Sequence, residues 1–216
     1  MGIFRDLSKL IPDKGARSIV RKVGRVADKA ISHGVYEADR AAFFAEAERT
    51  GERTTPAEFP VLPTTLAELM ASPYNDLRSP ICTAALFVVA LTAHSQNRDE
   101  SIAMINYLRG PNSISADDVR LLDEALMQNS TSINLVRSYF AGAVPQNGYT
   151  PSQPFTVVVI DNPYTYLDTN VVHEYAHLHV RCGGSDAPRA ITMRKDGNGL
   201  WYLWEHTFFE KIFPTM

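Results

Sequence analysis

The segment from His173 to His177 reads H-E-x-x-H, a pattern typical of zinc-dependent peptidases. On a helix, histidines at positions i and i+4 share one face and can both bind Zn²⁺, while the glutamate polarises a metal-bound water. A third ligand and an open position are also needed, and Glu205 or Glu210 could supply that ligand further downstream. One hypothesis is therefore a small zinc metallopeptidase with His173, His177 and Glu205 as metal ligands and Glu174 as the catalytic residue.

The residues around this motif favour a strand over a helix. Apolar residues occupy every second position from Ala176 to Cys182, which is the periodicity of a half-buried strand that ends at Gly183-Gly184. In a strand, His173 and His177 lie about 13 Å apart, too far to share one metal ion. The periodicity predicts no metal site and no cofactor, and the zinc peptidase is kept as the alternative.

In a strand the same segment offers a different kind of site. Tyr175, His177, His179 and Arg181 project from one face, and Tyr202, Trp204 and His206 share one face of a later strand. If the two faces coincide, the sheet carries a polar and aromatic surface that suits an anionic or aromatic ligand. The alternative interpretation is a solvated sheet face with no ligand.

A short loop after the predicted strand supplies two further candidate residues. Gly183-Gly184 allows unusual backbone angles, and Asp186 and Arg189 are close enough in sequence to pair. Arg189 is a candidate for binding an anion. The interpretation we favour is that an Asp186–Arg189 ion pair fixes the connection between two strands.

The remaining pattern predicts an α+β fold, with a helical N-terminal half packed on a C-terminal antiparallel β-meander of about four strands. Residues 1–53 predict a basic amphipathic helical arm and a second helix, and the proline-rich residues 54–64 predict an extended connector. Residues 65–216 then form the α+β core domain. Its helices are expected within 65–128 and its strands within 155–216, where short β-branched runs alternate with Gly, Asn and Pro.

Charge and composition narrow the classes of function. The net charge is −3 over 216 residues, which argues against a nucleic-acid-binding protein. Residues 1–31 hold eight basic and three acidic side chains, a net +5, which leaves −8 for the rest. Such an arm can make peripheral contact with an anionic membrane or a protein partner. The simpler expectation is that it packs on its own domain.

Neither a signal peptide nor a membrane-spanning segment is predicted. The longest apolar run, 81–93, is short of the roughly 20 residues that a spanning helix needs. The two cysteines, Cys82 and Cys182, do not form a disulfide framework, so we expect a cytoplasmic protein.

Several sequence islands resemble an uncharacterised bacterial family defined by a domain of unknown function. The similarity covers roughly residues 60–216. Its most specific parts are G-G-S-D-A-P-R at 183–189 and W-Y-L-W-E at 201–205, and N-Y-L-R-G-P at 106–111 is similar too. The family pattern has no H-E-x-x-H before its Gly-Gly, so the resemblance implies that the motif here is incidental. It implies an architecture and no activity.

Together these observations predict a cytoplasmic, non-catalytic protein that binds a protein partner or a small ligand. The candidate ligand-binding residues are Tyr175, His177, His179, Arg181, Asp186, Arg189 and His206.

Overall fold

The computed structural model describes residues 51–127, 134, 136–166, 173–184 and 188–204. The arm and second helix predicted over residues 1–53 lie almost entirely outside this range, as do Glu205, His206 and Asp186. The described helices are α3 (Leu66–Met70), α4 (Pro80–Ala93), α5 (Arg98–Arg109) and α6 (Ala116–Met127). The strands are β1 (Arg53–Phe59), β2 (Phe155–Asp161), β3 (Glu174–Val180), β4 (Arg189–Lys195) and β5 (Trp201–Leu203).

Local signals in the sequence define where the helices begin. Thr65 and Glu68 form a reciprocal capping box at the start of α3, in which each side chain accepts a hydrogen bond from the backbone N–H of the other residue. The Ser79 side chain accepts a hydrogen bond from the backbone N–H of Cys82, and Pro80 occupies the first turn of α4. Asn97 caps α5 in the same way, with the N–H of Glu100 as its donor.

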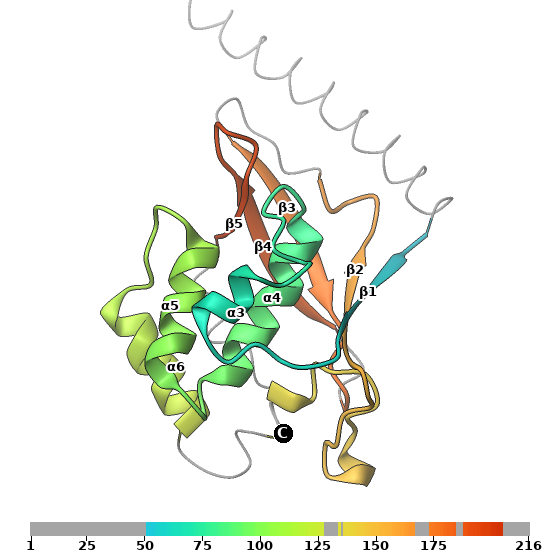
Figure 1. Cartoon of the computed structure of the whole chain (residues 1–216). Helices are drawn as coiled ribbons and strands as arrows, with labels where there is room; N and C mark the ends of the chain where they lie inside the picture. Colours follow the sequence, from blue (N-terminus) through green and yellow to red (C-terminus); the bar gives the residue numbers. More distant parts are fainter. Residues whose placement is uncertain (1–50, 128–133, 135, 167–172, 185–187, 205–216) are drawn as a thin grey trace, which may run out of the picture. The chain divides into compact units, whose positions relative to one another are not determined.

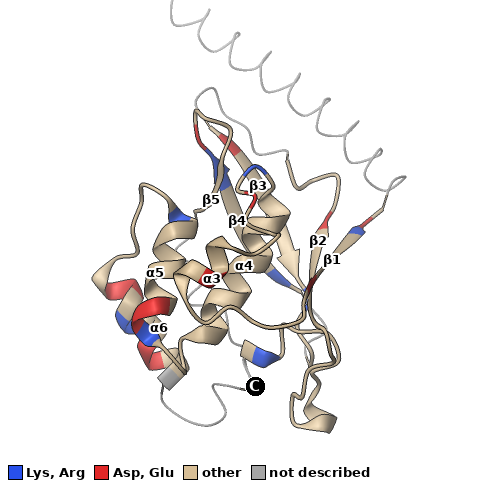
Figure 2. Ribbon diagram, viewed as in Figure 1, with Lys and Arg blue, Asp and Glu red and all other residues tan. Residues whose placement is uncertain are grey.

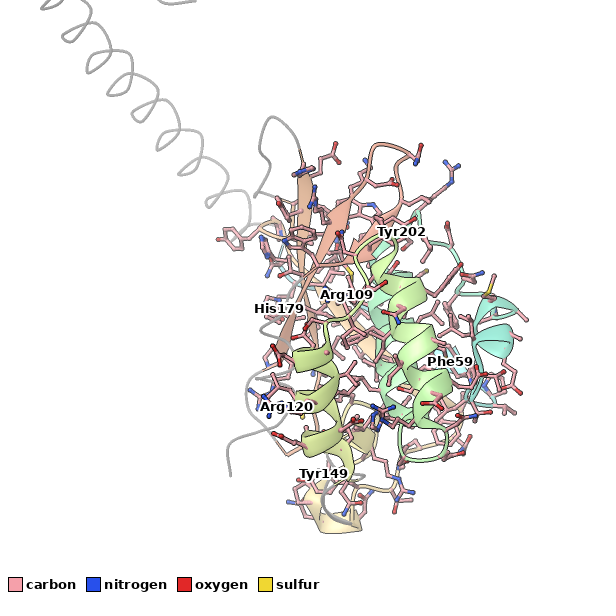
Figure 3. All side chains as sticks on the ribbon, turned by 90° about the vertical axis from the view of Figure 1, so that its left-hand side faces the viewer. Phe59, Arg109, Arg120, Tyr149, His179 and Tyr202 are labelled. Carbon is pink, nitrogen blue, oxygen red and sulfur yellow. The ribbon has the colours of Figure 1, made fainter. Side chains whose placement is uncertain are left out.

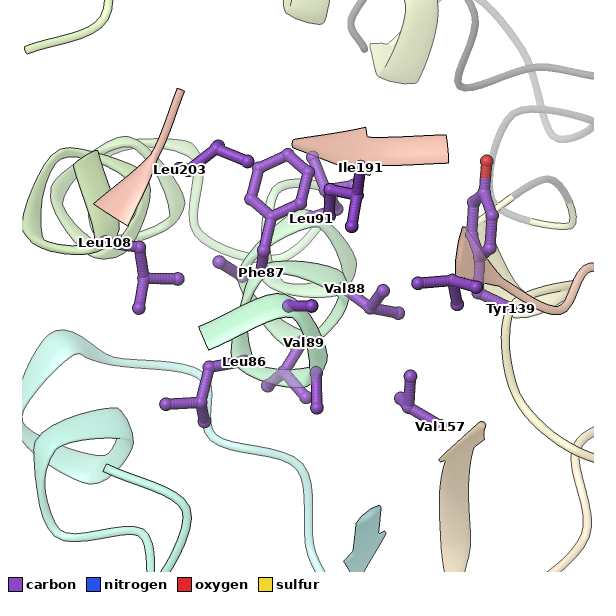
Figure 4. Packing of buried hydrophobic residues seen from close by; sticks show 14 of the residues in the cluster. Leu86, Phe87, Val88, Val89, Leu91, Leu108, Tyr139, Val157, Ile191 and Leu203 are labelled. Carbon is purple, nitrogen blue, oxygen red and sulfur yellow. The ribbon is translucent and has the colours of Figure 1, made fainter. Parts of the chain in front are cut away.

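Helix α4 is the centre of the hydrophobic core. It carries no charged residue, and every residue from 83 to 91 is buried (Figure 2). One side of α4 contacts the sheet, and α5 packs against another side of α4 (Figure 1). Phe87, Leu91 and Val88 lie among side chains from the strands and from α5 (Figure 4). A helix that is apolar on all sides must be buried on all sides, and this one is.

The five strands form one antiparallel sheet in the order β1-β2-β3-β4-β5. Strands β2 to β5 follow each other as the predicted meander. Two hydrogen bonds attach β5 to the helical layer: the Thr83 hydroxyl donates to the Trp201 carbonyl, and the Trp201 N–H donates to the Leu77 carbonyl. The inner face of the sheet therefore packs on α4, and its other face is called here the outer face.

Strand β1 adds a fifth strand to a sheet expected to have about four, and it occupies part of the segment 54–64, which was expected to be an extended connector. It pairs with β2 along its whole length, from Arg53 opposite Asp161 to Phe59 opposite Phe155. The backbone N–H of Glu58 donates to the Tyr74 hydroxyl, so N–H groups at even positions of β1 point away from β2. Pro56 is also at an even position, where a missing N–H breaks no bond to β2.

The α+β prediction is confirmed, since helices cover one face of an antiparallel sheet. In the sequence, the helices α3 to α6 lie between β1 and β2. The sheet therefore contains one strand that precedes these helices and four strands that follow them. Within the described residues, no helix has both the length and the apolar character needed to cross a bilayer.

Candidate functional site

Strand β3 places three candidate side chains on the outer face of the sheet. Ala176, Leu178 and Val180 are fully buried on the inner face, while Tyr175, His177 and His179 alternate with them and are half-buried. The expectation that residues around 174–180 form a strand is confirmed.

The strand separates the parts of the H-E-x-x-H motif. The Glu174 carboxylate accepts a 2.8 Å hydrogen bond from Lys195 Nζ, His177 Nδ1 lies 3.2 Å from the Thr192 hydroxyl, and His173 contacts Arg194. The shared helical face that this motif requires for zinc is therefore missing. Among the residues that the structure describes, no three potential ligands come close enough to hold a metal ion. The third proposed ligand, Glu205, lies outside them.

Arg194 in β4 is the centre of the outer face. It stands opposite Tyr175 in β3 and opposite Tyr202 in β5. Its guanidinium carbon lies 4.1 Å from the ring centroid of Trp204, a cation–π arrangement. Its Nη2 atom contacts both ring nitrogens of His173, with 2.8 Å to Nδ1. The cation is thus held between an indole ring and an imidazole ring.

Tyr175 connects the two rings around Arg194. Its own ring meets Trp204 edge-on at a centroid distance of 6.3 Å and His173 at 6.4 Å. We call His173, Tyr175, His177, Arg194 and Trp204 the sheet-face cluster. The Tyr202 and Trp204 face of the last strand was expected to join the Tyr175 face if the sheet allowed it. Trp204 does contact Arg194 and Tyr175, whereas the Tyr202 ring lies against Gly110 at the end of α5.

The cluster carries net positive charge. Among the described residues, no carboxylate pairs with Arg194, whereas its neighbour Lys195 is paired with Glu174. Burial lowers the pKa of His179; Glu52 opposes this with a smaller effect, and the positive form of His177 lowers the pKa by less again. His179 is therefore neutral at pH 7, and Arg194 is the cation of the sheet-face cluster.

Arg189 does not join the cluster. Its guanidinium hydrogen-bonds the Tyr139 hydroxyl, and its Nε atom is buried without a partner among the described residues. Burial raises the pKa of Tyr139, and nearby Cys182 acts in the same direction, so the phenol stays protonated. The expected Asp186–Arg189 pair cannot be assigned, because Asp186 lies outside the described residues.

In the described part of the loop before β4, Cys182 and Gly183 contact the segment 138–143. The Ser138 hydroxyl lies 3.0 Å from Cys182 Sγ, and the Gly183 N–H donates to the Ser138 carbonyl at 2.7 Å. A Cβ atom at Gly183 would lie 1.7 Å from the Ala143 carbonyl oxygen, so only glycine fits there. Arg181, another candidate, is exposed beyond the end of β3 and belongs to neither group.

Arg194 and Trp204 are the site residues that the candidate set lacked. Arg194 stands opposite Tyr175 in the register of β3 and β4, and Trp204 directly follows the last residue of β5. The alternation from Ala190 to Lys195 is visible in the sequence, but the pairing register that brings Arg194 to Tyr175 is not.

A five-stranded antiparallel sheet with a helical layer on one face places the described residues in the α+β class. The chain belongs to the family whose model is described as Domain of unknown function (DUF6935), which matches residues 61–215. This confirms the family relationship expected from the sequence islands. Comparisons with curated proteins and with solved structures gave no significant match.

Proposed function

We propose that this chain is a non-catalytic binding protein that holds a small anionic ligand with an aromatic part on the outer face of its sheet. The observation that carries the proposal is Arg194, a half-buried cation stacked on Trp204 with no carboxylate partner among the described residues. A ligand carboxylate or phosphate would supply the missing negative charge, because the guanidinium presents several N–H donors in a fixed plane.

The rings around Arg194 suit the aromatic part of such a ligand. Trp204 and Tyr175 are half-buried, so part of each ring stays accessible to solvent. Aromatic rings prefer edge-on or offset contacts. The planes of the Tyr175 and Trp204 rings are tilted by 62°, so a ligand ring could meet one of them edge-on and the other in an offset stack. An inorganic anion would use only the cation, whereas an aromatic anion would use the rings as well.

The burial of Thr192 supports a binding role over catalysis. Among the described residues, the Thr192 hydroxyl contacts His177 as a nucleophile would contact a base, but Thr192 is only 3% exposed and its hydroxyl is out of reach of a substrate. The proposal needs no metal and no cofactor. We further propose that the protein acts in the cytoplasm, and that residues 1–31 give it a peripheral contact with a membrane or a protein partner.

Calorimetric titration with phenyl phosphate tests the proposal. Arg194→Gln removes the cation and is expected to weaken binding by about tenfold or more, since hydrogen bonds to charged groups contribute about 1.5–3 kcal/mol. Lys195→Gln is the matched control, because Lys195 is the next residue of the same strand and points to the opposite face, where it pairs with Glu174. Equal weakening by both substitutions, or no binding by the unaltered protein, would contradict the proposal.

A further inference from the structure

A second surface lies where β1 ends and α3 begins, remote in sequence from the sheet-face cluster. It is a hollow of about 340 Å³ between residues 58–63 and the segment 68–73. Phe59, Leu62 and prolines give it mainly apolar walls. Val61, which lines it, is 79% exposed, and nearby Met70 is 49% exposed. We call this surface the β1–α3 hollow.

The charged residues that line the hollow are both acidic. Glu58 is exposed, and no cation pairs with it among the described residues. One carboxylate oxygen of Glu68 accepts hydrogen bonds from the Thr64 N–H at 2.7 Å and from the Thr64 hydroxyl at 3.0 Å. These bonds lower the pKa of Glu68, so its negative charge persists in mildly acidic solution. No Lys or Arg lines the hollow among the residues that the structure describes.

The edge of β1 that faces away from β2 has no strand partner in the described part of the chain, and beside the hollow it offers acceptors and few donors. Pro56 has no N–H, and the N–H of Glu58 is already bonded to the Tyr74 hydroxyl at 2.7 Å. The carbonyl groups of these two residues point away from β2 in the same direction, because both groups of one residue point to one side of an antiparallel strand. A regular added strand would lack partners there, whereas side chains that donate hydrogen bonds would find them.

We propose that the β1–α3 hollow binds an extended segment of a partner protein in which aliphatic and basic side chains alternate. The aliphatic side chains cover Val61 and Leu62, which removes exposed apolar surface from water. The basic side chains reach Glu58, Glu68 and the edge carbonyls of β1. The occupant follows from the charge: apolar walls with only acidic charged groups match a segment that is both apolar and basic.

Fluorescence anisotropy with a labelled six-residue peptide tests this proposal on the full chain. The probe alternates lysine with valine or leucine, and matched peptides carry glutamate or glutamine in place of lysine. We expect the lysine peptide to bind most tightly and to lose affinity as salt is raised. Glu58→Gln should weaken binding about threefold to fivefold, and Val61→Ser by about fivefold.

Two exposed residues elsewhere give matched controls. Val144→Ser removes an apolar side chain from the turn at 145–147, and Asp117→Asn removes one negative charge from α6. Neither should change the affinity for the peptide. Equal binding of the glutamate peptide, no binding of the lysine peptide at millimolar concentration, or equal effects of target and control substitutions would overturn the proposal. So would concentration-dependent dimerisation that Val61→Ser abolishes, because a second copy would then be the occupant.

Discussion

Replacing Gly110 by alanine tests how α5 holds the edge strand β5 in place. Gly110 follows the last turn of α5 with φ 60° and ψ −125°. Residues other than glycine adopt this backbone conformation only at a cost in free energy. An added Cβ would also lie 2.5 Å from Cε1 of the Tyr202 ring, which is well inside contact distance. Tyr202 lies at this end of α5 (Figure 3). Two separate penalties therefore meet at one position.

The size of each penalty can be worked out from the geometry. The positive φ costs about 1–2 kcal/mol for a residue with a side chain. The contact with Tyr202 adds about 1–3 kcal/mol, the usual cost of overpacking. Gly110→Ala should therefore lower the free energy of unfolding by about 2–5 kcal/mol. In a Gly110→Ala/Tyr202→Ala double variant the contact is gone and the backbone strain is not, so the coupling energy should be about 1–3 kcal/mol.

Urea unfolding of the two single variants, the double variant and the unaltered protein measures both quantities. Gly197→Ala is the control, because no atom lies within 4 Å of its Cβ position and its φ is outside the left-handed region. This control should stay within about 0.5 kcal/mol of the unaltered protein. A Gly110→Ala variant as stable as the control, or a coupling energy near zero, would refute the packing of α5 on β5.

Three further predictions concern stability. Burial is the main cause that lowers the pKa of His94, whose side chain is fully buried between α4 and Asp123. The unfolded state therefore binds the proton more readily, and stability should fall as the pH drops below about 6.5. The difference between the urea midpoints at pH 7.5 and pH 5.5 should be smaller in His94→Gln than in the unaltered protein. Phe87→Ala in the core should cost about 3–5 kcal/mol by thermal unfolding, against less than about 0.5 kcal/mol for exposed Val61→Ala. Gly183→Ala should cost about 3 kcal/mol or more in the same assay, because the Ala143 carbonyl must move.

Local signals were enough to predict most of the helices and the meander. The apolar run of α4 has no polar face, and the capping box of α3 acts within four residues, so both depend on neighbours in sequence. The alternation of apolar and polar residues in β3 correctly predicted a strand rather than the helix that H-E-x-x-H would need. Periodicity reflects burial along a whole element, whereas a five-residue motif can arise by chance.

Strand β1 could not be predicted in the same way. Its partner β2 begins at Phe155, far along the chain, and nothing local shows that the two segments meet. Pro56 argues against a strand until the strand is known to lie at an edge with that position turned outward. The strand therefore depends on tertiary pairing and on the hydrogen bond to Tyr74.

The candidate site was predicted in part. Tyr175 and His177 were placed correctly on one face from their alternation. The turn at 196–199 consists of Asp, Gly and Asn residues, which favour turns. That turn is closed by the Asp196 carboxylate, which accepts the N–H groups of Asn198 and Leu200. The register between β3 and β4 brings Arg194 opposite Tyr175. The sequence alone does not show which residues of the two strands stand opposite each other, so this contact could not be predicted.

The proposed anion site on the outer sheet face is tested most directly by the two tryptophan indole signals in a proton–nitrogen NMR spectrum. Trp204 stacks on Arg194 on the outer face, whereas Trp201 is 6% exposed on the inner face. Phenyl phosphate should shift the Trp204 signal in a saturable way, leave the Trp201 signal in place, and lose this effect in Arg194→Gln. A Trp204 signal that does not move, or one that moves equally in Arg194→Gln, would contradict the account.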